Sequence, residues 1–197
     1  MSEINATAKS APHVSKTFVF AILLIALAAF TTTALAAEKP GVGDSAKDFE
    51  LMGLDGKKVM LSEQVKMGPV VLVVLRGYPG YQCPLCTRQV GELISKSADF
   101  KKAGARVLMV YPGPSEKLKE HAMEFVNGKE FPENFSVLMD PDYKFTNSYN
   151  LRWKGSGETA YPSTFVIDSK NMIQYAKVSM THGDRAPVGD VLKALGK

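Results

Sequence analysis

Two cysteines, Cys83 and Cys86, are the only cysteines in this chain of 197 residues, and Pro84 and Leu85 separate them. A helix is expected to begin at this pair. Cysteines three positions apart at a helix start lie close enough to form a disulfide. The partial positive charge at a helix N-terminus also stabilises a thiolate, which is the reactive form of cysteine. The spacing therefore predicts reversible thiol–disulfide chemistry.

The place of each cysteine on the expected helix predicts a division of roles. Cys83 stands at the rim and should be the exposed, attacking thiol, whereas Cys86 lies one turn further, on the apolar face, and should resolve the intermediate. Arg76 follows the preceding strand and could add to the positive field around the thiolate. That strand contains no carboxylate to accept a proton, so water or Glu92 remains as the base.

Two other interpretations of the cysteine pair remain open. A structural disulfide that closes a four-residue loop would stabilise the fold little, because the stabilisation grows with loop length. A zinc site would need two more ligands, and besides the cysteines the chain offers only His13, His121 and His182. Redox chemistry is favoured because it needs no further residue, no metal and no cofactor.

The segment before the cysteines, residues 70–75, is an unbroken apolar run typical of a strand buried on both faces. A helix is expected from Cys83 to about Ala103, and a second buried strand at 106–110. The remaining pattern predicts strands at 137–139, 163–167 and 172–178 and helices at 115–126, 142–149 and 188–195, the first of these capped by Ser115.

Two short strands at 48–52 and 58–61 flank Asp55-Gly56, a strong turn signal, and predict a hairpin. After this hairpin, strands and helices alternate along the chain. The pattern indicates an α/β fold with a central mixed sheet and helices on both faces.

The N-terminal residues 1–36 have the pattern of a secretory signal peptide. Two lysines precede an apolar run at 18–30, and an Ala-x-Ala site follows at 34–36. An uncleaved membrane anchor is the alternative, because the uncharged stretch at 17–37 is just long enough to span a bilayer. Both interpretations predict export, to the periplasm or to the outer face of the membrane.

The rest of the chain is expected to be a short linker at 37–41 and one domain at 42–197. The net charge is +4, but the longest runs of Lys and Arg are pairs. Nucleic-acid binding needs a concentrated basic patch. No nucleic-acid partner is therefore expected.

Two further segments have the character of a known family. Residues 43–51 look like the opening of the peroxiredoxin-type proteins, and residues 163–168 look like their late strand. With the hairpin, the buried strand and the cysteine pair in the same order, residues 42–196 resemble the peroxiredoxin-like branch of the thioredoxin-fold superfamily, which includes alkyl hydroperoxide reductase C and thiol-specific antioxidant proteins. The resemblance implies a thioredoxin-like fold with an N-terminal β-hairpin.

The resemblance is mixed at the positions that carry chemistry. Peroxiredoxins have the motif Pro-x-x-x-Thr/Ser-x-x-Cys; here Pro79 and Cys86 match it, and Cys83 replaces the Thr/Ser. The match implies Cys86 as the peroxidatic cysteine. Peroxiredoxins also have an arginine where this chain has Pro162, and thioredoxins have a cis-proline there. We expect Pro162 to be cis beside a thioredoxin-type Cys-x-x-Cys, although Gln82 stands where thioredoxins have Trp.

The combined pattern favours an exported thiol–disulfide oxidoreductase, in which Cys83 attacks a protein disulfide and Cys86 resolves the mixed disulfide. The alternative is a thiol-dependent hydroperoxide reductase, in which Cys86 attacks the peroxide and Cys83 resolves the sulfenic acid. Both reactions require an external thiol donor. Pro162, Pro79 and Arg76 are expected to position the substrate.

An alternative of another class is a copper-binding or non-catalytic protein of the same fold, with His182 as a third copper ligand. Arg185, in the loop before the last helix, is expected to be an ordinary surface arginine, with an approach to the cysteines as the alternative. The aromatic residues Tyr149, Trp153 and Tyr161 are expected to serve mainly in packing.

Overall fold

The computed structural model describes residues 38–196. The expected signal peptide or anchor at 1–36 and the first residue of the expected linker lie outside the described residues. Within residues 38–196, no helix has the length and apolar character needed to cross a membrane. The described residues include nearly all of the domain expected at 42–197.

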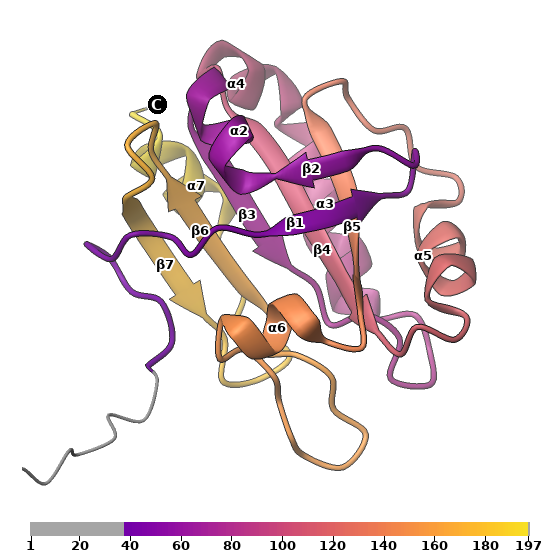
Figure 1. The fold of residues 1–197 in the computed structure, drawn as a ribbon. Helices are drawn as coiled ribbons and strands as arrows, with labels where there is room; N and C mark the ends of the chain where they lie inside the picture. The colour runs from indigo at the N-terminus through magenta and orange to yellow at the C-terminus, as the bar shows by residue number, and fades with distance from the viewer. Residues whose placement is uncertain (1–37, 197) are drawn as a thin grey trace, which may run out of the picture. The chain divides into compact units, whose positions relative to one another are not determined.

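A seven-stranded mixed sheet forms the centre of the domain (Figure 1). Its strands are β1 (Glu50–Gly53), β2 (Lys58–Met60), β3 (Val70–Val74), β4 (Arg106–Gly113), β5 (Phe135–Pro141), β6 (Ser163–Ile167) and β7 (Ile173–Val178). Their order across the sheet is β2-β1-β5-β4-β3-β6-β7. The pairs β3–β4 and β4–β5 are parallel, and the other four pairs are antiparallel. The mixed sheet and the β1–β2 hairpin agree with the prediction.

Helices cover both faces of this sheet (Figure 1). They are α2 (Leu61–Met67), α3 (Pro84–Ser95), α4 (Ser97–Lys102), α5 (Leu118–Val126), α6 (Lys144–Ser148) and α7 (Val188–Ala194). The apolar side chains of α3, α4, α5 and α7 form one core cluster with the sheet, and those of α2 and α6 form a second cluster on the opposite face.

The valine-rich strand β3 lies between these two clusters. Val71 and Val73 contribute to the core under α3, whereas Val70, Leu72 and Val74 contribute to the core under α2 and α6. All five residues are buried. Because successive side chains of a strand point to opposite faces, a strand covered on both sides must be apolar throughout. β3 therefore anchors the start of the cysteine loop between the two core clusters.

Two predicted helices differ from the observed ones. The helix expected from Cys83 to Ala103 is interrupted at Lys96, where φ is −106° and ψ is 16°, and α4 follows as a separate short helix. Ser115 does not cap α5, because its N–H and its hydroxyl both bind the Asp142 carboxylate. The helix begins at Leu118 instead.

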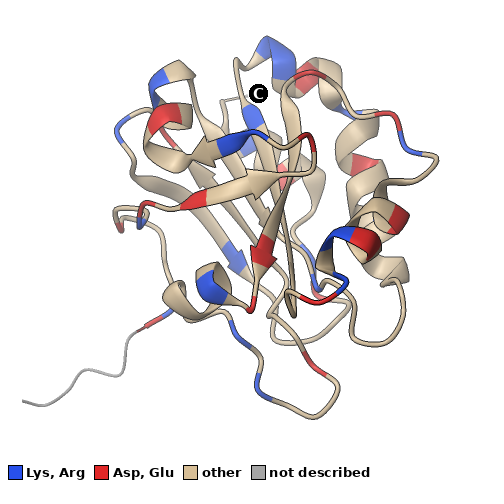
Figure 2. Cartoon of the chain, turned by 45° about the vertical axis from the view of Figure 1, so that its right-hand side comes forward, with Lys and Arg blue, Asp and Glu red and all other residues tan. Residues whose placement is uncertain are grey.

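Charged residues of both signs are interspersed along the elements of the domain (Figure 2). Several form exposed pairs, such as Lys58 with Glu50 and Lys66 with Glu63, both at 2.8 Å. Exposed pairs of this kind contribute little to stability, about 0–1 kcal/mol each. The Arg76–Glu158 pair beside the cysteines, described below, is of a different kind, because the two side chains are only 5% and 15% exposed.

Candidate active site

The loop at 76–82 leads from the end of β3 to the cysteines. Leu75 N–H still donates to the Val110 carbonyl oxygen at 2.9 Å, so pairing with β4 continues one residue beyond β3. At Gly77 the chain turns with φ of 71°, and a Cβ there would lie 2.0 Å from the carbonyl oxygen of Pro112. Only glycine fits this close approach of two backbones. The turn places the start of α3 at the carboxyl ends of β3 and β4.

The N-terminus of α3 is built around the cysteine pair. Cys83 is the N-cap residue, and Pro84 occupies the first helical position, where its missing N–H has no consequence. Cys86 N–H donates to Cys83 Sγ at 3.4 Å, so the cysteine sulfur takes the place of the oxygen that usually caps a helix. The helix begins at the pair, as the spacing predicted.

Both cysteines are free and buried, with only 2% of Cys83 and 1% of Cys86 exposed. The prediction of an exposed Cys83 at the helix rim is wrong. Cys83 packs into the same apolar cluster as Cys86, Leu75 and Tyr111 instead of facing solvent. Without movement of the surrounding segments, only a small molecule can reach the sulfurs.

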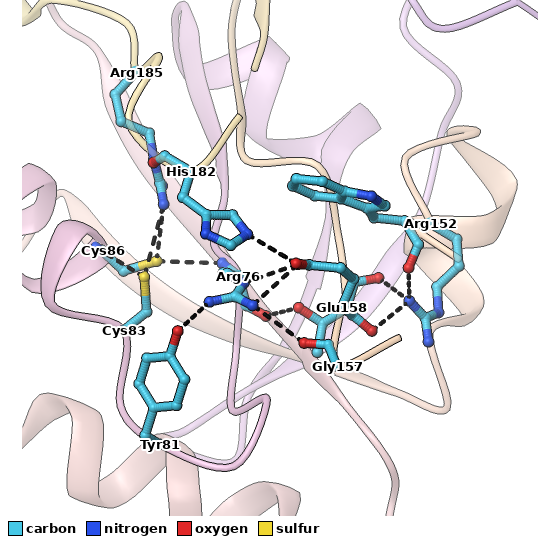
Figure 3. Close-up of polar contacts among 11 residues, drawn as sticks. Arg76, Tyr81, Cys83, Cys86, Arg152, Gly157, Glu158, His182 and Arg185 are labelled. Carbon is cyan, nitrogen blue, oxygen red and sulfur yellow. Dashed lines mark hydrogen bonds and ion pairs between the residues drawn. The ribbon is translucent and has the colours of Figure 1, made fainter. Parts of the chain in front are cut away.

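Arg185, in the loop between β7 and α7, points at both sulfurs (Figure 3). Its Nη2 lies 3.6 Å from Cys86 Sγ and 3.8 Å from Cys83 Sγ. Its Nη1 donates to Gln89 Oε1 at 2.9 Å, and its Nε donates to the His182 carbonyl oxygen at 2.8 Å. The expectation of an ordinary surface arginine is wrong. Arg185 is a fixed cation beside the two thiols.

The surroundings of the pair place the negative charge on Cys83. The Cys86 thiol donates a hydrogen bond to Cys83, the Cys86 N–H donates another, and Arg185 adds positive charge; together these outweigh burial and lower the pKa of Cys83 to about 5. The same thiol–thiolate hydrogen bond and burial raise the pKa of Cys86 well above its ordinary value. The two thiols therefore titrate as a coupled pair, and their surroundings favour the loss of one proton well before the other.

Arg76 acts on the thiols through its backbone. Its N–H donates to Cys86 Sγ at 3.3 Å. Its guanidinium is directed elsewhere: Nη2 pairs with Glu158 Oε2 at 3.0 Å, and Nη1 donates to the Tyr81 hydroxyl oxygen at 2.7 Å (Figure 3). The Thr159 hydroxyl donates to the Arg76 carbonyl oxygen. Side-chain contacts thus fix the peptide that holds Cys86, whereas the sequence suggested a guanidinium beside the thiolate.

The buried Arg76–Glu158 pair continues to His182, whose Nε2 lies 3.0 Å from Glu158 Oε1. The His182 ring also lies 5.1 Å from Trp153, and Trp153 stacks on Tyr161 with ring centroids 4.8 Å apart. The residue considered as a copper ligand therefore binds a carboxylate. In the part of the chain that the structure describes, no three or more His, Cys, Asp or Glu residues are grouped to hold a metal ion.

Three other predicted positions make no hydrogen bond to the sulfurs in the described part of the chain. No peptide bond within residues 38–196 is cis, so the prediction of a cis Pro162 is wrong; its carbonyl oxygen accepts the Ser179 N–H at 2.8 Å and joins the ends of β6 and β7. Pro79 lies half-buried in the bend of the cysteine loop. Glu92 lies on the exposed face of α3, 3.9 Å from Arg88, where it cannot act as a base for the thiols.

Gln82, which replaces the Trp of thioredoxins, fastens the cysteine loop to its neighbours. Its Oε1 accepts from the Tyr111 hydroxyl at 2.9 Å, and its Nε2 donates to the His121 carbonyl oxygen at 2.9 Å. The loop is thus tied to β4 and α5 directly before Cys83.

Sequence reasoning missed the roles of Glu158 and Gln89, and it preferred a surface position for Arg185 over an approach to the cysteines. One signal was available for Arg185. The resemblance places an arginine at the position of Pro162, and a buried thiolate that lacks this arginine needs a cation from another segment. No comparable signal pointed to Glu158 or Gln89, whose partners are distant in the sequence.

Residues 42–176 match the AhpC/TSA family. Chloroplastic peroxiredoxin Q of Oryza sativa subsp. japonica is 28% identical over 157 residues, which are 80% of this chain and 67% of that protein. Peroxiredoxin Bcp of Escherichia coli (strain K12) is 32% identical over 138 residues, which are 68% of this chain and 82% of that protein.

The crystal structure of peroxidoxin BcpB from Mycobacterium tuberculosis superposes with a TM-score of 0.67 at 22% sequence identity. The superposition covers 81% of this chain and 97% of that chain. The likeness confirms the predicted thioredoxin-like fold.

Proposed function

Because this chain belongs to the AhpC/TSA family, we propose that it is a thiol-dependent hydroperoxide reductase that works through Cys83 and Cys86. Family membership makes it a thiol-based oxidoreductase, and two of its relatives carry the name peroxiredoxin. The substrate is a hydroperoxide. The oxidised product is a Cys83–Cys86 disulfide, which an external thiol donor reduces.

The burial of both sulfurs is the observation that carries this proposal over disulfide exchange. A protein disulfide must bring two sulfur atoms and their flanking backbone into line with the attacking thiolate, whereas Cys83 is only 2% exposed. A hydroperoxide presents a single oxygen atom. The guanidinium of Arg185, within 4 Å of both sulfurs, adds a donor for the peroxide oxygens.

The charge distribution supports Cys83 as the attacking thiolate. Its lowered pKa, about 5, leaves it ionised at neutral pH, and the sulfur at the helix N-cap is held by N–H donors and by Arg185. Attack on the peroxide converts Cys83 to a sulfenic acid and releases an alcohol or water. Cys86 then condenses with the sulfenic acid, forming the disulfide and releasing water.

The sequence motif and the pKa values of the two thiols favour different attacking residues. The alignment with the peroxiredoxin motif places Cys86 in the peroxidatic position. We assign the attack to Cys83 because its pKa is lowered to about 5, whereas the hydrogen bond to Cys83 and burial raise the pKa of Cys86. The two assignments lead to the same disulfide, and single-cysteine variants separate them.

We also propose that the protein works outside the cytoplasm. The signal-like pattern at 1–36 supports export, and the periplasm or the outer face of the membrane is the compartment that we expect. Fractionation of cells that produce the full chain, with the signal-like run left intact or broken by two aspartates, tests this. Retention of the intact chain in the cytoplasm would contradict it.

The test of the catalytic proposal is peroxide consumption by the purified protein, with dithiothreitol as electron donor and hydrogen peroxide or tert-butyl hydroperoxide as substrate. The Cys83→Ser/Cys86→Ser double variant supplies the background rate. Dimedone, which labels sulfenic acids, is then added to the single variants. We expect a label on Cys83 in Cys86→Ser and no rapid label in Cys83→Ser.

The opposite labelling pattern would move the attack to Cys86 and leave the peroxidase function in place. Wild-type protein that consumes no peroxide above background, while Cys86→Ser forms a mixed disulfide with a protein disulfide substrate, would refute the peroxidase function. That outcome would favour thiol–disulfide exchange, for which a low-pKa thiolate at a helix N-terminus is also suited.

A further inference from the structure

Two hydrogen-bond donors from distant segments of the chain reach the same sulfur atom. The Arg76 backbone nitrogen lies 3.3 Å from Cys86 Sγ, and Arg185 Nη2 lies 3.6 Å from it. Arg76 follows β3, whereas Arg185 stands in the loop between β7 and α7. Because Cys86 is only 1% exposed, little water is present to replace a donor that turns away. The residues that hold the two donors in place therefore affect the chemistry of the sulfur.

The Arg76 peptide is held by three consecutive residues of the loop before β6. The Arg76 guanidinium contacts Glu158 Oε2 through Nε at 3.1 Å and through Nη2 at 3.0 Å. Nη2 also donates to the Gly157 carbonyl oxygen at 3.1 Å, and the Thr159 hydroxyl donates to the Arg76 carbonyl oxygen. A charge-assisted contact of this kind, buried on both sides, holds the residue in one orientation. The direction of the Arg76 N–H thus depends on Glu158.

The same carboxylate reaches Arg185 through His182. Both oxygens of Glu158 face His182 Nε2, Oε1 at 3.0 Å and Oε2 at 3.1 Å. The backbone carbonyl oxygen of His182 accepts a hydrogen bond from Arg185 Nε at 2.8 Å. Arg185 Nη1 donates to Gln89 Oε1 at 2.9 Å, and Nη2 is directed at the sulfurs. Glu158 fixes the residue whose carbonyl oxygen orients this guanidinium.

We propose that Glu158 is a positioning residue for the reaction of the cysteine pair, because one buried carboxylate orients both donors that reach Cys86 Sγ (Figure 3). It acts through Arg76 on one side and through His182 and Arg185 on the other. Cys86 takes part in the cycle whether it attacks or resolves, so the role is the same for both orders of attack. Because the role concerns the redox cycle of the pair, it rests on the proposed function.

The two donors act differently on the two redox states of the pair. Once a thiol of the reduced pair has lost its proton, an N–H group and a guanidinium stabilise the negative charge on sulfur. The disulfide carries no charge, and neutral sulfur is a weak acceptor, so the same donors contribute little to it. A couple whose reduced form is stabilised is a stronger oxidant. By orienting the donors, Glu158 should therefore raise the reduction potential of the pair.

The sign of the change separates positioning from a direct effect of charge. A carboxylate repels a nearby thiolate, so removing the charge of Glu158 would by itself favour the reduced state. The Arg76 guanidinium, left without its counter-charge, would act in the same direction. If Glu158 orients the donors, its removal lets them turn away and favours the disulfide. A purely structural role lowers the stability of both redox states alike and leaves the potential unchanged.

The experiment measures the equilibrium of the Cys83–Cys86 disulfide with glutathione. Two molecules of glutathione reduce the disulfide to two thiols and become one molecule of oxidised glutathione. The fraction of reduced protein is determined by alkylation and mass spectrometry, at a pH above the measured pKa of the more acidic thiol in every variant. Wild type is compared with Glu158→Gln and with Glu92→Gln, the matched control, which removes the same charge from the exposed face of α3.

We expect Glu158→Gln to lower the equilibrium constant for reduction by about tenfold, the lower end of the contribution of a hydrogen bond to a charged group. Tenfold corresponds to about 30 mV for this two-electron couple. Glu92→Gln should leave the constant at the wild-type value. A change in Glu158→Gln no larger than in the control, or an increase of the constant, would overturn the positioning role.

His182→Ala tests the contact with Arg185 while the Arg76–Glu158 pair stays in place, and it serves also if Glu158→Gln does not fold. It should lower the equilibrium constant by less than Glu158→Gln does, and it should have no effect in an Arg185→Gln background. No decrease in the wild-type background, or the same decrease in both backgrounds, would overturn the role of Glu158 as the shared anchor. A protein that shows the expected shifts but consumes no peroxide would refute the proposed function alone.

Discussion

Replacing Arg185 with glutamine is expected to raise the pKa of Cys83 by about 1 to 3 units. Arg185 Nη2 lies 3.8 Å from Cys83 Sγ. Two unit charges at about 4 Å attract each other by roughly 4 kcal/mol at an effective dielectric constant of about 20. At about 1.4 kcal/mol per pKa unit, loss of this attraction would raise the pKa of Cys83 by at most about 3. Water that enters the space left by the guanidinium makes the rise smaller. The pKa of about 5 should therefore move to between about 6 and 8.

The pH dependence of iodoacetamide alkylation measures this shift, with mass spectrometry of peptides to confirm that Cys83 is the labelled residue. Arg88→Gln is the matched control, because it removes the same charge from the exposed face of α3, where Arg88 lies 3.9 Å from Glu92. Solvent and salt screen that position. Arg185→Lys should fall between wild type and Arg185→Gln, since lysine restores the charge without the forked contact to Gln89.

If Arg185→Gln and Arg88→Gln change the pKa of Cys83 by the same amount, the guanidinium does not stabilise the thiolate. The low pKa would then come from the helix N-terminus and Cys86 alone. The loop between β7 and α7 would then have no electrostatic role at the cysteines.

Three further predictions concern stability. Glu158→Gln leaves the Arg76 guanidinium buried without its carboxylate and should lower the free energy of unfolding by about 3 kcal/mol in urea titrations; a change below about 1 kcal/mol would show that the pair is not the anchor of the loop. Gly77→Ala should cost at least about 2 kcal/mol more than Gly80→Ala, because both glycines have positive φ but only at Gly77 would a Cβ meet a β4 carbonyl oxygen, at 2.0 Å; equal losses would contradict the clash. The stability of reduced wild type relative to Cys83→Ser should increase with pH, because a lowered pKa contributes stability that is fully present above the unfolded value of about 8.5 and is lost as the pH falls through about 5. Thermal melts of the two proteins across this pH range measure the difference in stability. A difference that does not change with pH would contradict the prediction.

The sequence predicted those features that depend on neighbouring residues. The Val-rich run specified a strand buried on both faces, and Asp55-Gly56 specified the hairpin, because both patterns reflect local geometry. The start of α3 at Cys83 followed from the same kind of reasoning. These local patterns were sufficient for the fold class and for the position of the cysteine pair.

The electrostatic part of the site could not be predicted in this way. Arg185 is separated from Cys86 by 99 residues and Glu158 from Arg76 by 82, so their contacts depend on how the loops before β6 and after β7 pack. The exposure of Cys83 was misjudged for the same reason, since a helix N-terminus is buried or exposed according to what covers it. Pro162 was assigned by analogy with thioredoxins, and analogy gave the wrong peptide geometry.

Trp153 is the only tryptophan in the chain, and its ring lies 5.1 Å from that of His182. His182 contacts Glu158, Glu158 pairs with Arg76, and the N–H of Arg76 reaches Cys86 Sγ. The molecule therefore carries an intrinsic fluorophore at the end of an unbroken series of contacts with its thiols. We expect oxidation and reduction of the pair to change the Trp153 emission through these contacts, which a fluorescence titration with peroxide and then dithiothreitol would measure without a label.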